Sequence, residues 1–165
     1  QAEEITAFLS PFISIVGRFT DEDRPLIESA IKRCNLNVLE FHGHESPSFC
    51  LGMPRKVIKA FDVFEVEDLS KVSRYQGIIS GLLLDTEHTD RQEGEIIKFD
   101  WGIGIKAKEY DIPLIISGNI QVDNLKKITQ LIKPYAIDVC EIVESELGKK
   151  DYNKMQEVIN LAKTI

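Results

Sequence analysis

Short apolar segments rich in β-branched residues recur along this chain, and amphipathic helical patterns separate most of them. The apolar segments begin near residues 12, 37, 57, 80, 113 and 135. This spacing of roughly 20 to 30 residues is the size of one strand plus one helix. The alternation predicts an α/β fold with six parallel strands in a single domain, residues 1–165.

The clearest helical signals lie between these strands. Residues 25–34 place an apolar face at helical spacing, Ser46 and Pro47 predict the capped start of a short helix, and apolar residues from Val66 to Tyr75 recur every three positions. Further helices are expected over residues 99–110, from Val122 onward and at the end of the chain, whereas residues 86–98 have no periodicity and predict a polar loop.

Charge and hydropathy exclude several classes of partner. The chain has 20 Lys and Arg against 27 Asp and Glu, a net charge of −7, and no basic cluster, so we expect neither a nucleic-acid partner nor an anionic membrane surface. The longest apolar runs, residues 78–84 and 112–116, are far too short to cross a bilayer. The first residues lack the features of a signal peptide, so we expect a cytoplasmic protein that binds a small molecule.

The cysteine and histidine pattern predicts no metal site. Three cysteines without close spacing give neither a disulfide framework nor a zinc motif. His42 and His44 alternate at a strand end and would point to opposite faces. We expect no metal and no other cofactor.

Several short segments with distinctive residues stand in one order along nearly the whole chain. They include Phe-His-Gly-His-Glu-Ser-Pro (residues 41–47) and Leu-Leu-Leu-Asp-Thr (residues 82–86). The others are residues 2–5, 57–61, 99–101 and 148–151. Together they resemble the phosphoribosylanthranilate isomerase family of tryptophan biosynthesis. Chain length alone favours an open, doubly wound sheet, but the resemblance implies a (β/α)8 TIM-barrel type. The six βα units would then be the third to eighth, with residues 1–9 the end of the helix after the second strand.

The family reaction, an Amadori rearrangement of an aminoaldose to an aminoketose, implies two proton-transfer groups. Asp85 matches the family's general acid, which opens the sugar ring; the alternative is that Asp85 caps the following loop. The family's base is a Cys in a Lys-x-Cys-Gly motif, which this sequence does not contain. Cys140, at the end of the last predicted strand, is a candidate substitute base, although a small buried hydrophobe is the commoner role of such a residue.

The phosphate-binding loops of the family are only partly matched. Gly118 and Asn119 stand where the family has Gly-Gly, and residues 140–144 replace Ser-Ser-Gly-Val-Glu, which brings Glu141 and Ile142 to the predicted cradle. Both changes weaken the expected binding of a phosphate. His42 and Lys59 are further candidate substrate contacts, each with a structural role as its alternative.

Two functions follow from these residues. The first is an isomerase of this family that acts on phosphoribosylanthranilate with Asp85 as the acid; the second is a non-catalytic, degenerate barrel that binds a metabolite or a partner chain. Six strands leave two sheet edges, so we also expect an upstream segment, a partner subunit (a second copy included) or an unusually short closure to cover them.

Overall fold

The computed structural model describes residues 1–85, 101–118 and 120–163, and within them no helix is long and apolar enough to cross a membrane. Its centre is one six-stranded sheet in the order β1-β2-β3-β4-β5-β6, with every neighbouring pair parallel. The strands are β1 (Val16–Phe19), β2 (Val38–Phe41), β3 (Lys56–Asp62), β4 (Gly81–Asp85), β5 (Leu114–Ser117) and β6 (Ala136–Ile137). The prediction of six parallel strands in chain order is confirmed.

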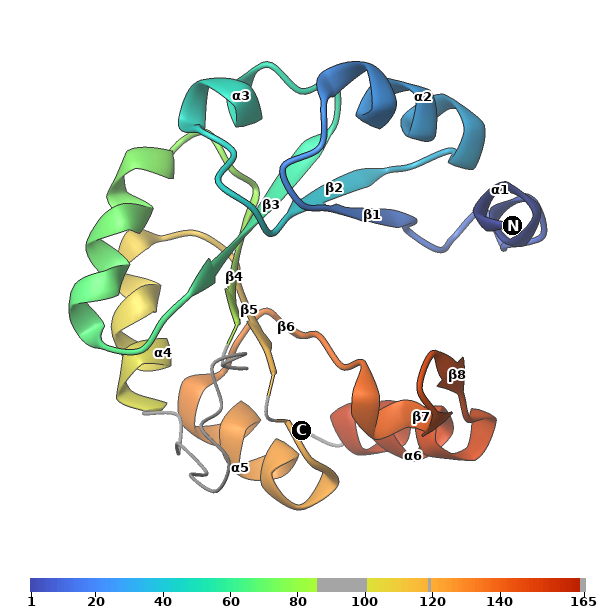
Figure 1. The fold of residues 1–165 in the computed structure, drawn as a ribbon. Helices are drawn as coiled ribbons and strands as arrows, with labels where there is room; N and C mark the ends of the chain where they lie inside the picture. Colours follow the sequence, from blue (N-terminus) through green and yellow to red (C-terminus); the bar gives the residue numbers. More distant parts are fainter. Residues whose placement is uncertain (86–100, 119, 164–165) are drawn as a thin grey trace.

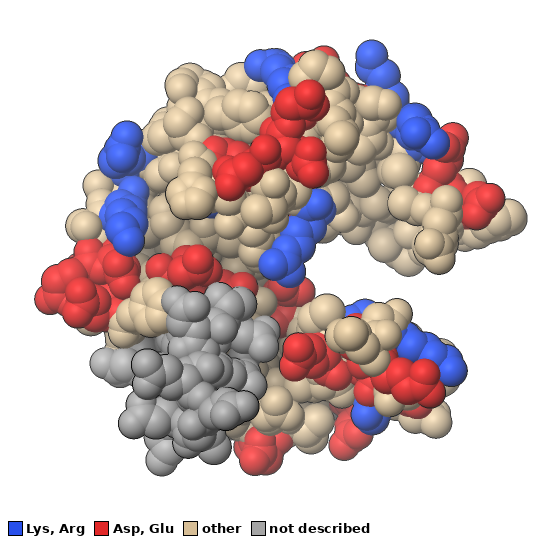
Figure 2. Space-filling model, in the orientation of Figure 1, with Lys and Arg blue, Asp and Glu red and all other residues tan. Residues whose placement is uncertain are grey.

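The sheet curls into an open half-barrel, with the connecting helices on its outer side (Figure 1). The helices and 3₁₀ turns are α1 (Ala2–Ala7), α2 (Arg24–Cys34), α3 (Pro47–Leu51), η1 (Val66–Tyr75), α4 (Trp101–Ala107), η2 (Lys108–Tyr110), α5 (Val122–Ile132), η3 (Glu141–Val143) and α6 (Tyr152–Lys163). Among the described residues, β1 and β6 each pair with a single neighbour. Figure 2 shows the hollow between these two edges, with charged side chains along its rim.

Local signals explain several helix boundaries. Asp23 caps α2 by accepting from the Leu26 amide, and Ser46 caps α3 by accepting from the Phe49 amide. The segment of residues 66–75 folds as a 3₁₀ helix, which has three residues per turn and therefore brings positions at spacing three onto one face. That face buries Leu69, Val72 and Tyr75.

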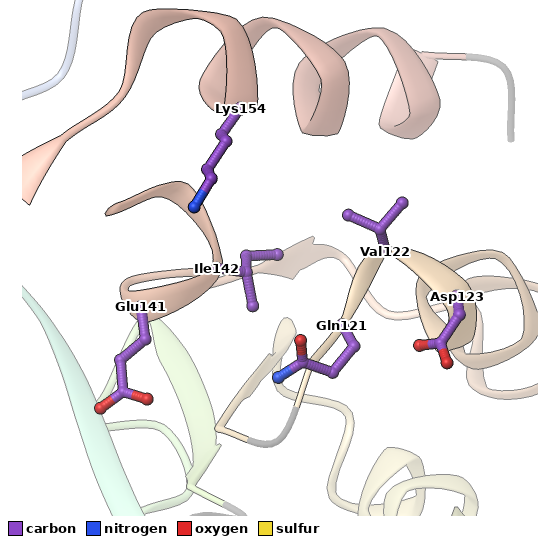
Figure 3. A pocket seen from close by; sticks show the side chains of 6 residues that line it. All are labelled: Gln121, Val122, Asp123, Glu141, Ile142 and Lys154. Atoms are coloured by element: carbon purple, nitrogen blue, oxygen red, sulfur yellow. The ribbon is translucent and has the colours of Figure 1, made fainter. Parts of the chain in front are cut away.

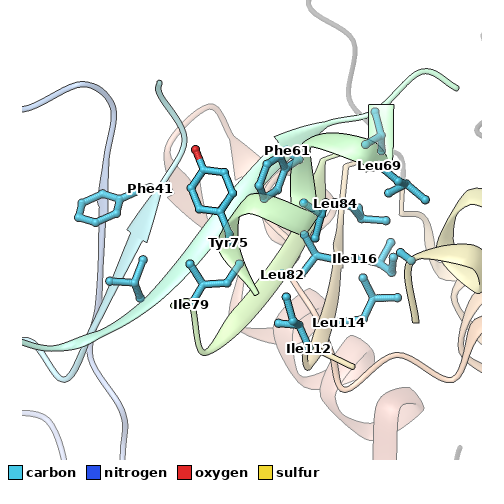
Figure 4. Packing of buried hydrophobic residues seen from close by; sticks show 14 of the residues in the cluster. Phe41, Phe61, Leu69, Tyr75, Ile79, Leu82, Leu84, Ile112, Leu114 and Ile116 are labelled. Atoms are coloured by element: carbon cyan, nitrogen blue, oxygen red, sulfur yellow. The ribbon is translucent and has the colours of Figure 1, made fainter. Parts of the chain in front are cut away.

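The core lies between the sheet and its outer helices. Alternate strand residues such as Leu39 and Phe41 on β2 and Leu82 and Leu84 on β4 are fully buried there (Figure 4). The ring of Tyr75 packs edge-on against Phe61, with 5.2 Å between ring centroids. Because side chains alternate along a strand, the residues between these apolar ones face the hollow.

Two predicted strands have other boundaries in the structure, and one hairpin was not predicted. The strand expected at residues 12–17 begins later, because the ladder with β2 starts where Asn37 bonds the backbone of Ile15, and Phe12 is 95% exposed in a turn before it. The last strand is reduced to two residues. A hairpin of β7 (Glu144–Glu146) and β8 (Lys149–Lys150) was not predicted. The loop expected at residues 86–98, with Phe99 and Asp100, lies outside the described residues.

Candidate active site

Polar side chains line the hollow at the carboxyl ends of the strands. They come from four strands and two strand-end segments: Arg18, Glu40, His42, Asp85, Ser117 and Asp138. In barrels of βα units, this end of the sheet is where catalytic groups gather. The hollow is therefore the candidate active site.

Asp85 is the last residue of β4 and is half-buried. Its Cα pairs with that of Asp62 on β3 and with that of Ser117 on β5. Leu84 points to the core, so Asp85 faces the hollow. A carboxyl group in this position, half withdrawn from water, has the geometry that a general acid needs.

Ser117 and Asp138 form a second polar pair on the same face. The Ser117 hydroxyl donates to Asp138 Oδ2 at 3.1 Å. Burial raises the pKa of Asp138, and the nearby carboxylate of Glu40 adds to this effect, while the Ser117 hydrogen bond and the charges of Arg18 and His42 oppose it. The charge of Asp138, after β6, thus interacts across the hollow with charged groups of β1 and β2.

His42 forms a close pair with Glu40 of β2. The imidazole Nε2 lies 2.7 Å from Glu40 Oε1, and the two side chains are 8% and 13% exposed. Positions two apart on an extended strand share a face, so both point into the hollow. The structure thus places His42 on the same face of the sheet as Asp85.

Lys59 lies on the other face of the sheet. It is 3% exposed, and its Nζ donates to the carbonyl oxygens of Phe41 at 3.2 Å, Gly43 at 2.8 Å and Ala60 at 2.8 Å. An ammonium group has three N–H donors, so these carbonyls use all of them. This arrangement favours the structural role of Lys59 over contact with a substrate carboxylate.

Gly118 follows β5 with φ of +71°, a left-handed conformation that glycine adopts without strain. The turn after β5 therefore uses a backbone conformation that favours glycine, and the role of Gly118 in binding a phosphate stays a prediction. Asn119, the second residue of the predicted phosphate cradle, lies outside the described residues.

A cavity of about 580 Å³ lies between the segments that follow β5 and β6. Gln121, Val122 and Asp123 line it from the start of α5, Glu141 and Ile142 from η3, and Lys154 from α6 (Figure 3). The Lys154 Nζ donates to the carbonyl oxygen of Glu144 at 2.6 Å. With two carboxylates and one ammonium, the side chains around this cavity are net acidic.

Cys140 is exposed at the start of η3, beside the hairpin β7–β8. Its Sγ lies 3.1 Å from Lys150 Nζ, and Lys150 also bonds Glu144 at 2.7 Å. This ion pair lowers the pKa of Glu144 and raises that of Lys150. The contacts of the thiol thus belong to the hairpin.

No group of three or more His, Cys, Asp or Glu side chains within the described ranges has the geometry to hold a metal ion. Sequence reasoning missed Glu40, Ser117 and Asp138 as site residues. Period-two alternation was the available signal, because Glu40 and Ser117 each follow a buried core residue and Asp138 follows the partly buried Ile137.

Fold and site together define an enzyme-type βα-barrel protein with its ionisable groups at the carboxyl ends of the strands. A family model described as N-(5'-phosphoribosyl)anthranilate (PRA) isomerase matches residues 1–161. The N-(5'-phosphoribosyl)anthranilate isomerases of Geobacter metallireducens and Geobacter sulfurreducens are 36% and 37% identical to the chain over 163 residues, 99% of this chain and 79% of each relative. The chain belongs to the N-(5'-phosphoribosyl)anthranilate isomerase family.

Solved structures agree with this assignment. The crystal structure of phosphoribosyl anthranilate isomerase from Thermotoga maritima superposes with a TM-score of 0.88 at 29% identity, covering 99% of this chain and 80% of that one. Another, with a TM-score of 0.85 at 28% identity, is a complex with reduced 1-(o-carboxyphenylamino)-1-deoxyribulose 5-phosphate. It covers 99% of this chain and 78% of that one. The TIM-barrel type expected from the sequence is confirmed.

Proposed function

We propose that this chain catalyses the isomerisation of N-(5'-phosphoribosyl)anthranilate, with Asp85 as the general acid. Asp85 protonates the ring oxygen of the ribose, and the C–O bond opens as the anthranilate nitrogen forms a Schiff base. The proton at C2 then passes to a base, which gives an aminoenol. C1 takes up a proton from that base while the 2-hydroxyl proton returns to the Asp85 carboxylate, which gives the aminoketose. The observation that supports this role most directly is the position of Asp85 at the end of β4, facing the hollow between Asp62 and Ser117.

The other site residues have supporting roles in this proposal. His42, held by Glu40, faces the hollow within reach of a bound sugar, and the cavity beside Gln121 and Glu141 lies where the phosphate end would be received. The named complex of a relative with a 5-phosphate supports a phosphorylated substrate. We do not assign Cys140 a proton-transfer role, because its thiol is engaged by Lys150.

The test follows the fluorescence change of the anthranilate group on turnover. Asp85→Asn keeps the shape and removes the acid, so we expect kcat to fall by about 10²- to 10⁴-fold. Asp111→Asn is the matched control. Asp111 is exposed and precedes the amino end of β5, whereas the site lies at the carboxyl end of that strand. Asparagine tolerates the left-handed φ of 55° at this position. Equal rates for wild type and Asp85→Asn would contradict the assignment.

A second candidate function is supported by the acidic side chains at the phosphate end of the hollow. Glu141 opposes a phosphate dianion, as expected for a non-catalytic barrel that binds another metabolite or a partner chain. Binding of the reduced product analogue, measured by calorimetry, separates the two. Binding with turnover supports the isomerase, and a folded chain that neither binds nor turns over supports the alternative.

We also propose that further polypeptide covers the outer edges of β1 and β6, which pair with no further strand in the described part of the chain. In the working, cytoplasmic protein this polypeptide belongs to the same chain or to a partner such as a second copy. Unpaired strand edges template association, and the three cysteines are free, as in a reducing compartment. Light scattering after size exclusion tests the partner: a well-folded monomer of the 165-residue chain would rule it out.

A further inference from the structure

Directly behind His42, on the outer face of the sheet, lies a buried ion pair. Lys59 and Glu45 are 3% and 6% exposed, and Lys59 Nζ lies 3.4 Å from Glu45 Oε2. Two of the three carbonyl oxygens that accept hydrogen bonds from the Lys59 ammonium belong to Phe41 and Gly43, the residues on either side of His42. Lys59 therefore holds the backbone of His42 on both sides.

The carboxylate of Glu45 extends this hold to a second loop. Its Oε1 accepts from the amide of Asp21 at 2.9 Å and from that of Gly43 at 3.3 Å. Its own carbonyl oxygen accepts from the Tyr75 hydroxyl at 2.9 Å. The pair thus joins the loop after β1, the loop after β2 and the helix η1 at one point.

The two loops approach so closely that Gly43 has no space for a side chain. A Cβ on Gly43 would lie 2.3 Å from Asp21 Oδ1 and 2.6 Å from the Asp21 amide nitrogen. Asp21 in turn accepts from the His44 amide and lies 3.0 Å from His44 Nδ1. These bonds, led by the amide of His44, hold the pKa of Asp21 below its usual range. His42 is consequently the middle of a segment that is bonded before and after it.

We propose that Lys59 and Glu45 are positioning residues that fix the imidazole of His42 at the mouth of the active site. This inference rests on the proposed function for its catalytic consequence only. Burying two charges is costly, and an apolar pair of the same volume packs a core as well or better. What an apolar pair does not supply is the set of hydrogen bonds to the carbonyls and amides that flank His42.

The decisive variant replaces both charges together with apolar side chains of similar size, Lys59→Met with Glu45→Leu. It avoids leaving one buried charge alone, and it removes the acceptor for the Asp21 and Gly43 amides. The control is Lys106→Met with Glu109→Leu, which removes an exposed Lys–Glu pair, 2.8 Å apart, on the helical segment before β5. Melting temperatures confirm that both double variants are folded before any other comparison.

The first readout needs no catalysis. The ¹⁵N shifts of the imidazole nitrogens report which nitrogen carries the proton, and the pairing with Glu40 predicts a single Nε2–H form of His42 in the wild type at a pH where the ring is neutral. His42→Asn assigns the signal among the three histidines. We expect the double variant, unlike the control, to show several His42 conformers and at least tenfold faster exchange of the Gly43 amide.

The second readout is turnover. In the folded double variant we expect kcat to fall about 10- to 100-fold with a smaller change in KM, because a small displacement of a site group costs a rate of this order. Unchanged His42 signals, or displaced signals with wild-type kcat, would overturn the positioning role. A wild-type chain without turnover would instead remove the proposed function, and the His42 signals alone would still decide the role of the pair.

Discussion

The two halves of the mouth are built differently. After β2, the loop that contains His42 is held by a buried ion pair. The Lys59 ammonium donates to the backbone on either side of His42, and the amide of Asp21 donates to the Glu45 carboxylate. After β6, the segment of η3 and the hairpin is held by groups nearer the surface, including the exposed thiol of Cys140 and a Lys150–Glu144 pair whose side chains are 41% and 10% exposed. The buried pair makes hydrogen bonds to the backbone of both loops, although Glu45 Oε2 has only the Lys59 ammonium, at 3.4 Å, and accepts no hydrogen bond among the described residues. Buried hydrogen bonds restrict a loop to one geometry, whereas ion pairs open to solvent contribute little. We infer that the β2 side presents a preformed surface and that the β6 side adapts to what it binds.

The largest effect is expected from breaking the β2 side with Lys59→Met alone. Glu45 would remain buried without its cation, and removal of one partner of a buried pair costs about 3–5 kcal/mol of unfolding free energy. Urea unfolding measures this loss. Lys106→Met, at an exposed pair, is the control and should stay within about 0.5 kcal/mol of the wild type.

Gly43→Ala should lower stability by about 1–3 kcal/mol, because the added methyl group meets the backbone of Asp21 and forces the two loops apart. Thermal unfolding checks the loss. In the control Gly52→Ala, the nearest atom is the end of the flexible Arg24 side chain at 2.9 Å, which moves at little cost. Equal losses at the two glycines would contradict the close loop contact.

On the β6 side, Glu141→Gln tests the electrostatics of the cavity. A carboxylate within several ångströms of a phosphate costs about 1 kcal/mol in a well-hydrated site, so its removal should tighten binding of a 5-phosphate ligand about fivefold. Calorimetry measures the dissociation constant. Glu146→Gln, on the exposed hairpin, removes the same charge outside the cavity and should leave the constant unchanged.

The smallest effect is expected at Asp138, whose carboxylate accepts a hydrogen bond from Ser117 and is repelled by the carboxylate of Glu40. Its folded-state pKa is raised by burial, so the charged form weakens the fold above that pKa and the penalty disappears as pH falls below the ordinary value of 3.8. Asp138→Asn should therefore raise the urea midpoint at pH 7 but not at pH 3. An equal rise at both values would contradict burial of the charge as the cause.

The strand order and most helices were predictable, because each depends on local periodicity and caps. Asp85 was predictable for the same reason: a carboxylate at the end of an apolar strand must lie at the edge of the sheet. The placement of Lys59 on the outer face of the sheet was also predictable. Lys59 lies two residues after Val57 and two residues before Phe61. Because side chains alternate along a strand, Lys59 shares the outer face with these two buried apolar side chains.

What could not be predicted depends on loop paths. Glu45 and Lys59 are 14 positions apart, and no spacing rule reports that the chain between them folds back to bring carboxylate and ammonium together. The hairpin β7–β8 has no apolar alternation, and its turn at Gly148, with φ of +76°, was the only local signal.

The partners of the Lys59 ammonium determine which substitutions the sequence around it tolerates. Its three hydrogen bonds go to backbone carbonyls, which every residue type provides. A change of side chain at position 41 or 60 therefore removes no acceptor, while position 59 requires a long side chain with several donors. Phe41 and Ala60 are themselves buried. In a library randomised at positions 41, 59 and 60 and selected for folding and turnover, we expect apolar side chains that fit the core at 41 and 60, and no variation at 59.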